Sequence, residues 1–431
     1  MIYLDFAAAT PVHPKVLEAM LPYFSENFYN PSAPYLPAKH LRGEYEAKKS
    51  ALAQTIGVKS PDLVITAGAT ESINLAFTVL ENYPDAEVLI LATEHASVRE
   101  SARHYAKKVA DIAVDHTGLI DLKDLAAKIT EKTVLISVAI ANNELGTIQP
   151  LSEIAEMIHK IREQRLAAGN LTPLYLHSDA SQAASLLDLS VARLGVDLLT
   201  LNSAKVYGPK GIGALYISRG IRLQPISYGG GQEMGLRSGT ENVPLLMGFT
   251  EASVRAKAHI SASRKKYEKY NQLFRQILIE KSLVTPKFLG NKKHQLANFC
   301  PICFDGLDAE RLIFKLEDRG ILLSTGAACA ASKGQKSHVL SAIGLTDSEI
   351  TGSLRVTFGE LNTEEQIREA ATAIAEVANQ EAKRIGLVLD EVVLKESHDT
   401  EPGQANSTEF SQNQGVAHEW RCSQDQGTAH E

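Results

Sequence analysis

Short apolar runs alternate with charged, alanine-rich segments between about residues 60 and 220. Six of these runs have the length and composition of strands: DLVIT, EVLILAT, TVLISVAI, LYLH, DLLTL and GALYI. Because the segments between them are helical in composition, the pattern predicts an α/β domain with a largely parallel sheet covered on both faces. Ligand-binding residues of such sheets lie at the carboxyl ends of strands, where several polar clusters of this chain stand.

A second unit is predicted at about residues 262–388, after the long charged helical segment EASVRAKAHISASRKKYEKYNQLFRQILIEK. The stretches QLANFCPICFDGL, ILLSTGAAC and SLRVTFG are strand-like and alternate with helical ones, which predicts a smaller α+β domain. From Leu389 the chain is polar, and SQNQGVAHE nearly recurs as SQDQGTAHE. We expect the tail at 389–431 to be disordered, with its histidines and Cys422 in a solvated linker rather than at a metal site.

Composition and charge exclude several classes of function. The 431 residues are 44% hydrophobic and 22% charged, as in an ordinary globular protein, and the net charge is −7. This balance provides no basic face for a phosphate backbone, so we expect no direct binding of nucleic acid. The N-terminus lacks a basic region before a long apolar stretch, and no apolar run approaches the ~20 residues that span a bilayer. We therefore expect a cytoplasmic protein without membrane contact.

The chain has four cysteines, at positions 300, 303, 329 and 422, which is too few for a disulfide framework. A reducing compartment is therefore expected, in which Cys329 is a free thiol. Cys300 and Cys303 have CxxC spacing, but they stand in a strand-like stretch, and no second CxxC or HxxxH follows. We interpret them as core residues of a strand, with zinc binding or redox chemistry as the alternative.

Three polar clusters follow strand-like runs. Lys205 stands between such a run and a turn rich in proline and glycine, where a desolvated amine can attack a carbonyl compound or pyridoxal phosphate; a surface lysine is the alternative. Asp179 follows LYLH and would suit the ring nitrogen of that cofactor, or it caps a helix. In LVITAGATESINLAF a predicted strand is followed by Gly68, Ala69 and Thr70, where a helix is predicted to begin. Such a helix start can bind phosphate, and a plain capped helix start is the alternative.

These stretches together resemble the pyridoxal-phosphate-dependent cysteine desulfurases of the NifS/IscS kind, which are class-V aminotransferases. The likeness extends to about residue 385 and rests on YLDFAAATPVHP, GATES, TEHASV, ANNELG, HSDASQ, KVYGPKGIGALY, GGGQEMGLRSGT and STGAAC, in this order. It implies fold type I of these enzymes, with a mainly parallel seven-stranded sheet between helices in the large domain and a smaller C-terminal α+β domain. The implied parts are an N-terminal segment at 1–15 that packs with the small domain, a large domain at 16–261 and a small domain at 262–388.

The resemblance also implies a role for each matching residue. Lys205 would be the Schiff-base lysine and then the proton shuttle at the substrate Cα, while His95 would stack on the ring and assist proton transfer. Asp179 would pair with the ring nitrogen, and Gln182 would hydrogen-bond the ring hydroxyl. Further cofactor contacts are implied for Ala69, Thr70, Asn143 and Asn202, and for Thr240 from the neighbouring subunit of a homodimer.

Substrate and sulfur transfer are implied in the same way. Arg355, with Asn143 beside it, would bind the carboxylate of L-cysteine, a task suited to a planar and permanently charged group. Cys329, among glycine, alanine and serine, would be the thiolate that takes the sulfur, leaving L-alanine and a persulfide. Its small neighbours suit a mobile loop that delivers sulfur to protein acceptors for iron–sulfur cluster assembly or tRNA thiolation. A small buried cysteine is the alternative.

Three residues depart from the family pattern. Asn202 and Ala204 stand where serine and histidine usually contact the phosphate, and Ala9 replaces a threonine. Unless the Asn202 amide restores a bond, we expect weakened cofactor binding. The leading hypothesis is a cysteine desulfurase. The alternatives are a selenocysteine lyase or another lyase or aminotransferase of the same fold, and a sulfur-carrier scaffold that binds the cofactor weakly.

Overall fold

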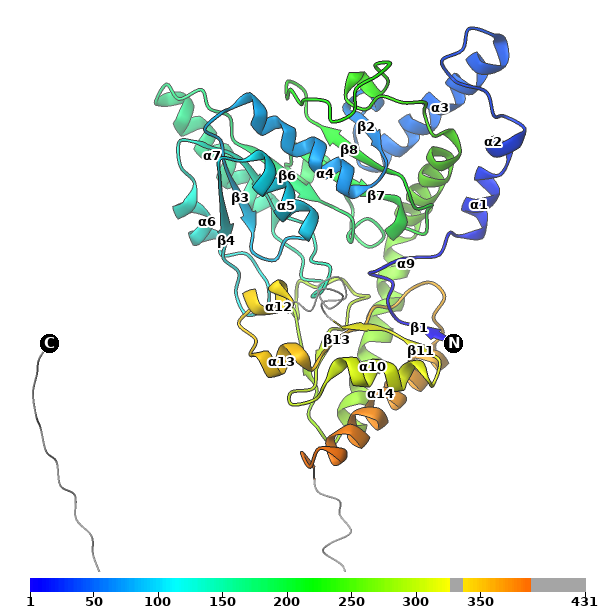
Figure 1. Cartoon of the computed structure of the whole chain (residues 1–431), viewed down its shortest axis with the longest axis vertical. Coiled ribbons are helices and arrows are strands. Elements are labelled where there is room, and N and C mark those ends of the chain that lie inside the picture. The colour runs from blue at the N-terminus through cyan, green and yellow to red at the C-terminus, as the bar shows by residue number, and fades with distance from the viewer. Residues whose placement is uncertain (326–335, 389–431) are drawn as a thin grey trace, which may run out of the picture. The chain divides into compact units, whose positions relative to one another are not determined.

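The computed structural model describes residues 1–325 and 336–388, and the chain up to Val388 forms one compact unit (Figure 1). Two predictions fall outside the described residues. The segment with Cys329 belongs to 326–335, and the polar tail with Cys422 is 389–431. Within the described ranges, no helix is both long and apolar enough to cross a membrane.

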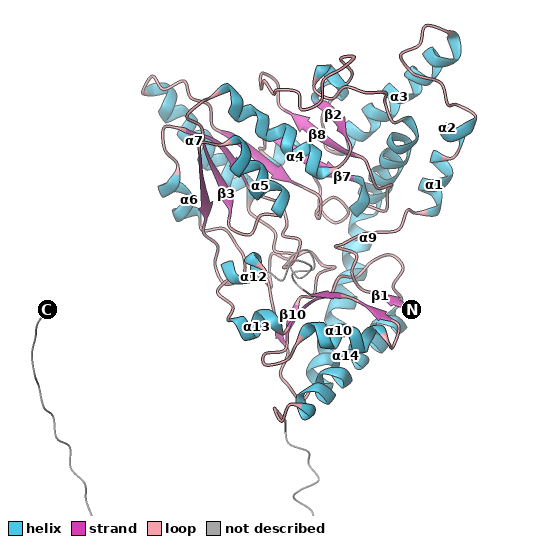
Figure 2. Cartoon of the chain, in the orientation of Figure 1, coloured by secondary structure: helices cyan, strands magenta, loops and turns pink. Residues whose placement is uncertain are grey.

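The largest sheet has seven strands (Figure 2). Their order is β2 (Leu63–Thr66), β8 (Gly213–Ile217), β7 (Leu198–Asn202), β6 (Tyr175–Asp179), β5 (Thr133–Ser137), β3 (Glu87–Leu91) and β4 (Lys108–Ile112). The pairings from β7 to β4 are parallel, whereas β8 is antiparallel to both of its neighbours. The predicted mainly parallel sheet is confirmed, and each of the six predicted runs overlaps one strand. The sequence reading missed β4, because its KVADI stretch buries only Ile112.

Different helices cover the two faces of this sheet, because successive strand residues point to opposite sides. Leu63 and Leu199 face α1 (Pro14–Met20), α3 (Leu36–Thr55), α6 (Leu122–Lys128), α7 (Leu151–Ala167) and the first turns of α9 (Val243–Lys281). Val64 and Leu198 face α4 (Ala69–Phe77) and α5 (Ala96–Tyr105). Two short helices, α2 (Pro22–Ser25) and α8 (Val191–Leu194), and 3-10 turns at Ser60–Asp62, Thr78–Asn82, Ser203–Lys205 and Glu233–Gly235 lie in connections.

A smaller α+β part follows α9 in the sequence and packs against this helix. Its antiparallel sheet has the order β12 (Ser324–Thr325), β13 (Ser353–Arg355), β10 (Ile302–Cys303) and β9 (Lys287–Phe288). The sheet shares a core with α9, α10 (Ala309–Glu317) and α14 (Glu364–Arg384), next to the short helices α12 (His338–Ala342) and α13 (Asp347–Thr351). At the N-terminus β1 (Ile2–Tyr3) pairs in parallel with β11 (Ile321–Leu322). The domain limits stay predictions, and the one at 261/262 falls inside the single helix α9.

The cysteines of the CxxC pair are buried, Cys303 within β10 and Cys300 just before it. Burial raises the pKa of each thiol to about 11, so both are mainly protonated at neutral pH. No group of three or more His, Cys, Asp and Glu side chains in the described residues is arranged to hold a metal ion. The burial of both cysteines agrees with the interpretation of the pair as core residues.

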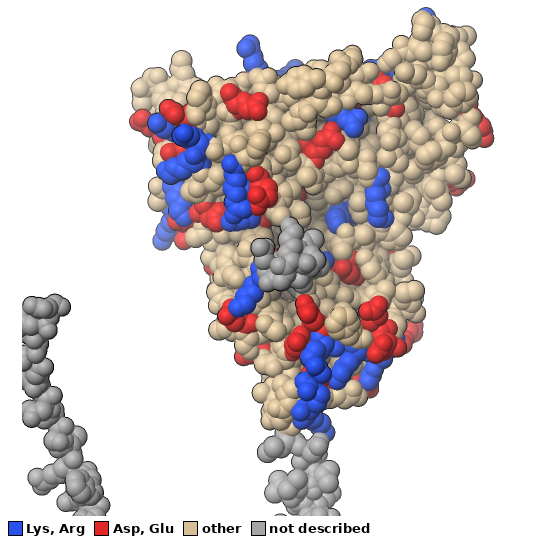
Figure 3. All heavy atoms as spheres, viewed as in Figure 1, with Lys and Arg blue, Asp and Glu red and all other residues tan. Residues whose placement is uncertain are grey.

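A buried carboxylate ties α14 to α10. Glu381 is 1% exposed and accepts hydrogen bonds from Arg384 Nε at 2.9 Å, Arg311 Nε at 2.8 Å and Lys315 Nζ at 2.9 Å. The bonds from Arg384 and Lys315, with the charges of the surrounding cations, lower the pKa of Glu381 to about 2 against the opposing effect of burial. Figure 3 shows the basic side chains that gather over α10 and α14. The negative charge of Glu381 therefore offsets the repulsion among these cations.

We predict that Glu381→Gln lowers the free energy of unfolding by about 1–3 kcal/mol at pH 7, because three cations lose their shared anion. The pKa of Glu381 is lower in the folded protein than the ~4.3 of an unfolded chain. The ionised group therefore stabilises the fold fully above about pH 5, and this contribution disappears as the pH falls toward 2. Urea unfolding of both proteins at pH 7 and pH 3 measures the effect. A difference that does not shrink at pH 3 would contradict the assignment.

Candidate active site

The ends of the neighbouring parallel strands β6 and β7 bring Asp179 and Lys205 to one edge of the sheet. Oδ1 of Asp179 accepts a hydrogen bond from the backbone N–H of Ser181 at 2.8 Å, so the carboxylate also caps the turn that follows. After β7, Oδ1 of Asn202 accepts the N–H of Ala204 at 3.1 Å and fixes the turn that carries Lys205. Both sequence-predicted residues thus stand on short, hydrogen-bonded turns.

The N-terminal segment contacts Lys205 at this edge of the sheet. Nζ of Lys205 donates to the carbonyl oxygen of Ala7 at 2.8 Å and also to that of Ala8. Nε2 of Gln182 donates to the same Ala7 oxygen at 3.1 Å. Thr10 donates its N–H and its hydroxyl to the carbonyl oxygen of Ala204, at 3.3 and 3.1 Å. The amine and the amide that the sequence singled out therefore converge on one backbone atom.

A strained residue holds the turn after the lysine. Tyr207 has φ +63°, a backbone conformation that is unfavourable for residues other than glycine and costs about 1–3 kcal/mol. Its N–H donates to Oγ1 of Thr10 at 2.9 Å, and its hydroxyl accepts the N–H of Glu360 at 2.7 Å. These contacts from two distant segments keep Tyr207, and with it the Lys205 turn, in this conformation.

His95 lies at the start of α5, where Nδ1 accepts the N–H of Ser97 at 3.2 Å and lies 2.8 Å from its hydroxyl oxygen. The ring is open to solvent on one side. Partial burial lowers the pKa of His95, and the cation of Lys205 lowers it further against the opposing effect of Asp179. The ring is therefore neutral at pH 7. Because Nδ1 accepts a backbone N–H, we assign the proton of the neutral ring to Nε2.

The smaller sheet contributes Arg355, at the end of β13. Its guanidinium is buried, and Nη2 and Nε donate to Oδ1 of Asp5 at 2.8 and 3.2 Å. Nη1 donates to the carbonyl oxygen of Asn143 at 3.2 Å. Arg355 and Asn143, which the sequence analysis placed at the substrate, are thus in direct contact.

The start of α4 is built for close approach. Gly68 precedes Ala69 with φ +149°, and no side chain caps the helix. A Cβ on Gly213 would lie 2.8 Å from Gly68 Cα, so only glycine at 213 lets this turn rest on β8. Thr70 is exposed beside it. The first turn of α4 therefore has N–H groups that no N-cap side chain accepts, and such groups can bind an anion.

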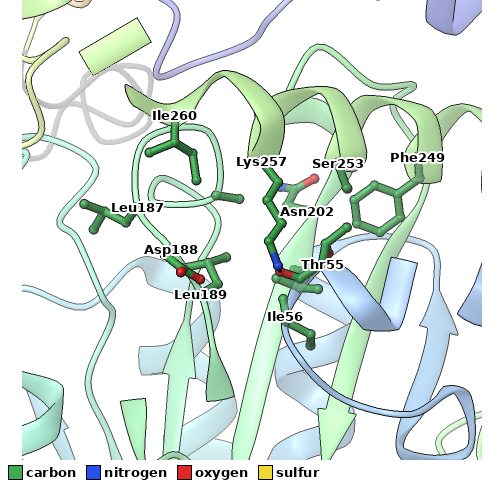
Figure 4. A pocket seen from close by; sticks show the side chains of 12 residues that line it. Thr55, Ile56, Leu187, Asp188, Leu189, Asn202, Phe249, Ser253, Lys257 and Ile260 are labelled. Atoms are coloured by element: carbon green, nitrogen blue, oxygen red, sulfur yellow. The ribbon is translucent and has the colours of Figure 1, made fainter. Parts of the chain in front are cut away.

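The remaining predicted residues are Thr240, Asn202 and Cys329. Thr240 is exposed, and within the described residues it makes no interaction with the other predicted site residues. Asn202 also lines a pocket under α9, where Lys257 donates to the carbonyl oxygen of Thr55 at 2.8 Å (Figure 4). Cys329 lies outside the described residues.

The model of the family "Aminotransferase class-V" matches residues 2–369. The chain belongs to the class-V aminotransferase family. A relative named cysteine desulfurase IscS 1, from Archaeoglobus fulgidus, is 39% identical over 375 residues, which are 85% of this chain and 94% of the relative. A solved NifS-like protein is 30% identical with a TM-score of 0.78, over 87% of this chain and 98% of its own. SspA, solved in complex with cysteine, is 32% identical with a TM-score of 0.71, over 83% and 99%.

These matches confirm the resemblance to NifS/IscS proteins and the expected fold type I. The chain also contains residues near the site to which the sequence analysis gave no role. Besides Asp5, they are Glu94, Glu144, Ser337 and His338. Oε2 of Glu144 accepts the hydroxyl of Ser337 at 2.6 Å, and Nε2 of His338 donates to the carbonyl oxygen of Glu94 at 2.8 Å. In the sequence, Glu94 and Glu144 stand inside TEHASV and ANNELG, and no pattern in these motifs reveals a distant partner.

Glu94 is a buried acid next to His95. Its Oε1 accepts the N–H of Ala139 at 2.6 Å, while Oε2 is buried without a partner among the described residues. Burial, together with the charge of Asp179, raises the pKa of Glu94 to about 8. The chain therefore holds a neutral carboxyl group next to His95 at pH 7.

We predict that Glu94→Gln is more stable than the wild type at pH 9 by at least about 1 kcal/mol, with a smaller difference at pH 5. The folded protein retains a proton that the unfolded chain loses at ~4.3, so wild-type stability is full below that pH and falls as the pH rises toward 8. Glutamine keeps an acceptor for Ala139 and never ionises. Urea unfolding at both pH values, with equal cofactor loading, measures this. Parallel pH profiles for the two proteins would show that Glu94 does not titrate in this way.

Proposed function

We propose that the protein is a pyridoxal-phosphate-dependent cysteine desulfurase, which converts L-cysteine to L-alanine and passes sulfane sulfur to acceptor proteins. The observation that carries the proposal is the convergence of Lys205 and Gln182 on the Ala7 oxygen, with His95 in electrostatic range of Lys205 and Asp179. Relatives that cover nearly the whole chain bear the name cysteine desulfurase, and one related structure contains cysteine.

The residues of this edge fit the cofactor. An amine, a carboxylate and an amide match its aldehyde, ring nitrogen and ring hydroxyl, and the uncapped start of α4 suits a phosphate. We assign Lys205 to the covalent bond, Asp179 to the ring nitrogen, Gln182 to the hydroxyl and His95 to the ring face. The phosphate contacts would come from Ala69, Thr70, Asn202 and the partner's Thr240. When bound, the cofactor supplies an electron-withdrawing ring for the amino acid.

Proton transfer would fall to Lys205 and His95. The lysine amine, once released from the cofactor, would move a proton at the substrate Cα. The neutral His95 ring carries its proton on Nε2 and would assist that transfer, while its Nδ1 is held by Ser97. Arg355 and Asn143 would fix the substrate carboxylate and so orient Cα toward the lysine.

Sulfur transfer would fall to Cys329. Its thiolate would attack the substrate sulfur, so that an S–S bond forms as the C–S bond breaks. The substrate carbon that loses sulfur would retain the electron pair of that bond and gain a proton, which yields L-alanine and a protein persulfide. Acceptors for iron–sulfur cluster assembly or tRNA thiolation would then receive the sulfur.

A homodimer is part of this proposal. Six large apolar side chains are exposed between residues 17 and 36, in α1, α2 and the segment leading into α3: Leu17, Leu21, Phe24, Phe28, Tyr35 and Leu36. Such a group of exposed apolar residues favours a protein interface. A second copy of this chain would cover them and bring its Thr240 to the phosphate.

We predict that the wild type, loaded with pyridoxal phosphate, forms L-alanine from L-cysteine, and that Lys205→Ala forms none. Cys329→Ser should keep the visible absorption of the cofactor yet yield neither L-alanine nor a persulfide by mass spectrometry. The matched control is Lys257→Ala, because Lys257 also donates to two backbone carbonyls, those of Gln54 and Thr55, and should leave activity unchanged. Undiminished L-alanine from Cys329→Ser would remove the thiol from the reaction. Failure to take up cofactor would favour the scaffold alternative, and sulfide release without persulfide would favour a lyase.

We predict that Ala204→His tightens the binding of pyridoxal phosphate about ten- to a hundredfold. A hydrogen bond to a charged group contributes about 1.5–3 kcal/mol, and histidine would restore one at the phosphate. The dissociation constant is measured by titration of the visible absorption. Ala9→Thr, another return to the family residue, is the control and should not change it. An unchanged constant for Ala204→His would count against the phosphate position.

A further inference from the structure

We propose that Asp5 is a positioning residue of the desulfurase reaction, which holds the Arg355 guanidinium in the orientation that binds the substrate carboxylate. This inference rests on the proposed function, in which Arg355 binds that carboxylate. The N-terminal segment would then set substrate affinity as well as contact the lysine.

The hydrogen bonds of Arg355 leave two N–H groups of the guanidinium available. Nε and Nη2 both donate to the same atom, Oδ1 of Asp5, and Nη1 donates to the carbonyl oxygen of Asn143. Arginine has five N–H groups, so one N–H on each terminal nitrogen has no acceptor among the described residues. Two N–H groups on neighbouring nitrogens are the pair that a carboxylate accepts with both oxygens.

The backbone around Asp5 is fixed against the smaller sheet. The carbonyl oxygen of Leu4 accepts the N–H of Thr357 at 2.8 Å, and that of Asp5 accepts the hydroxyl of Tyr3 at 2.7 Å. The N–H of Ala7 donates to Oγ1 of Thr357 at 3.0 Å. These bonds place the carboxylate beside β13, where Arg355 is 5% exposed. A guanidinium held on such a frame is preorganised for its ligand.

The same contact would also arise if Asp5 only neutralised a buried cation. Burial raises the pKa of Asp5, and Arg355 and then Lys205 lower it, so its charge serves both cations. A purely structural pair predicts lower stability of an Asp5 variant with unchanged substrate affinity. A positioning role predicts weaker binding of amino acids that carry a carboxylate, and of these only.

The test uses the cofactor-loaded enzyme and two readouts. The Kd of L-alanine, which has the carboxylate but no sulfur, is measured by absorption, and KM and kcat are measured for L-cysteine. For Asp5→Ala we expect Kd and KM to rise at least about tenfold, with a smaller change in kcat. Asp5→Asn keeps the one oxygen that accepts both N–H groups, and we expect both constants within about threefold of the wild type.

Two controls separate position from stability. Asp197→Ala removes another Asp–Arg pair, with Arg162, and its carboxylate is 16% exposed against 15% for Asp5. It should leave the Kd of L-alanine unchanged. Cysteamine, which lacks the carboxylate, should inhibit the wild type and Asp5→Ala equally.

Constants within twofold of the wild type for Asp5→Ala would overturn the proposal, as would an Asp5→Asn variant that loses as much as Asp5→Ala. If Asp5→Ala does not fold, Asp5→Glu replaces it, since one added methylene displaces the acceptor. We expect the same rise, and an unchanged Kd would again overturn the role. A wild type that forms no L-alanine from L-cysteine would refute the proposed function, while the Kd comparison would still decide the role of Asp5.

Discussion

The carbonyl oxygen of Ala7 accepts hydrogen bonds from both Lys205 and Gln182, and the geometry of the site depends on this convergence. A lysine amine at the end of a buried strand needs acceptors, and this segment supplies two consecutive ones. The same segment carries Asp5, which binds Arg355 of the smaller sheet. A short turn at residues 5–8 thus connects Lys205 with Arg355.

Two ionisable groups next to each other at this edge are held in neutral forms. His95 has a lowered pKa because of partial burial and the lysine cation, whereas burial raises the pKa of Glu94 to about 8. A neutral imidazole can both donate and accept a proton, which a charged ring cannot do. A neutral Glu94 adds no negative charge beside Asp179, which we propose as the partner of the ring nitrogen. The environments of these residues, rather than their identities, decide their roles.

The sequence predicted what local patterns encode. Six strands followed from apolar runs, and Lys205 and Asp179 followed from polar residues at the strand ends. The edge strand β4 was missed because four of its five residues are not buried. The pairing of Asp5 with Arg355 joins residues 350 positions apart, and no spacing in the sequence reveals such a contact. The same holds for Glu144 and Ser337, because a buried acid looks like a surface acid until the fold brings its partner.

The two ends of the site differ in how many polar contacts a single chain supplies. The N-terminal segment contacts both Lys205 and Arg355, and Arg355 is buried. At the end that we propose for the phosphate, Thr70 is exposed, and Ala204 has no side chain that could reach an anion. A doubly charged phosphate needs several donors, and the N–H groups of α4 alone are a weak substitute for them. A second protomer that adds its own Thr240 would complete this end, so cofactor affinity and assembly of the dimer should be coupled.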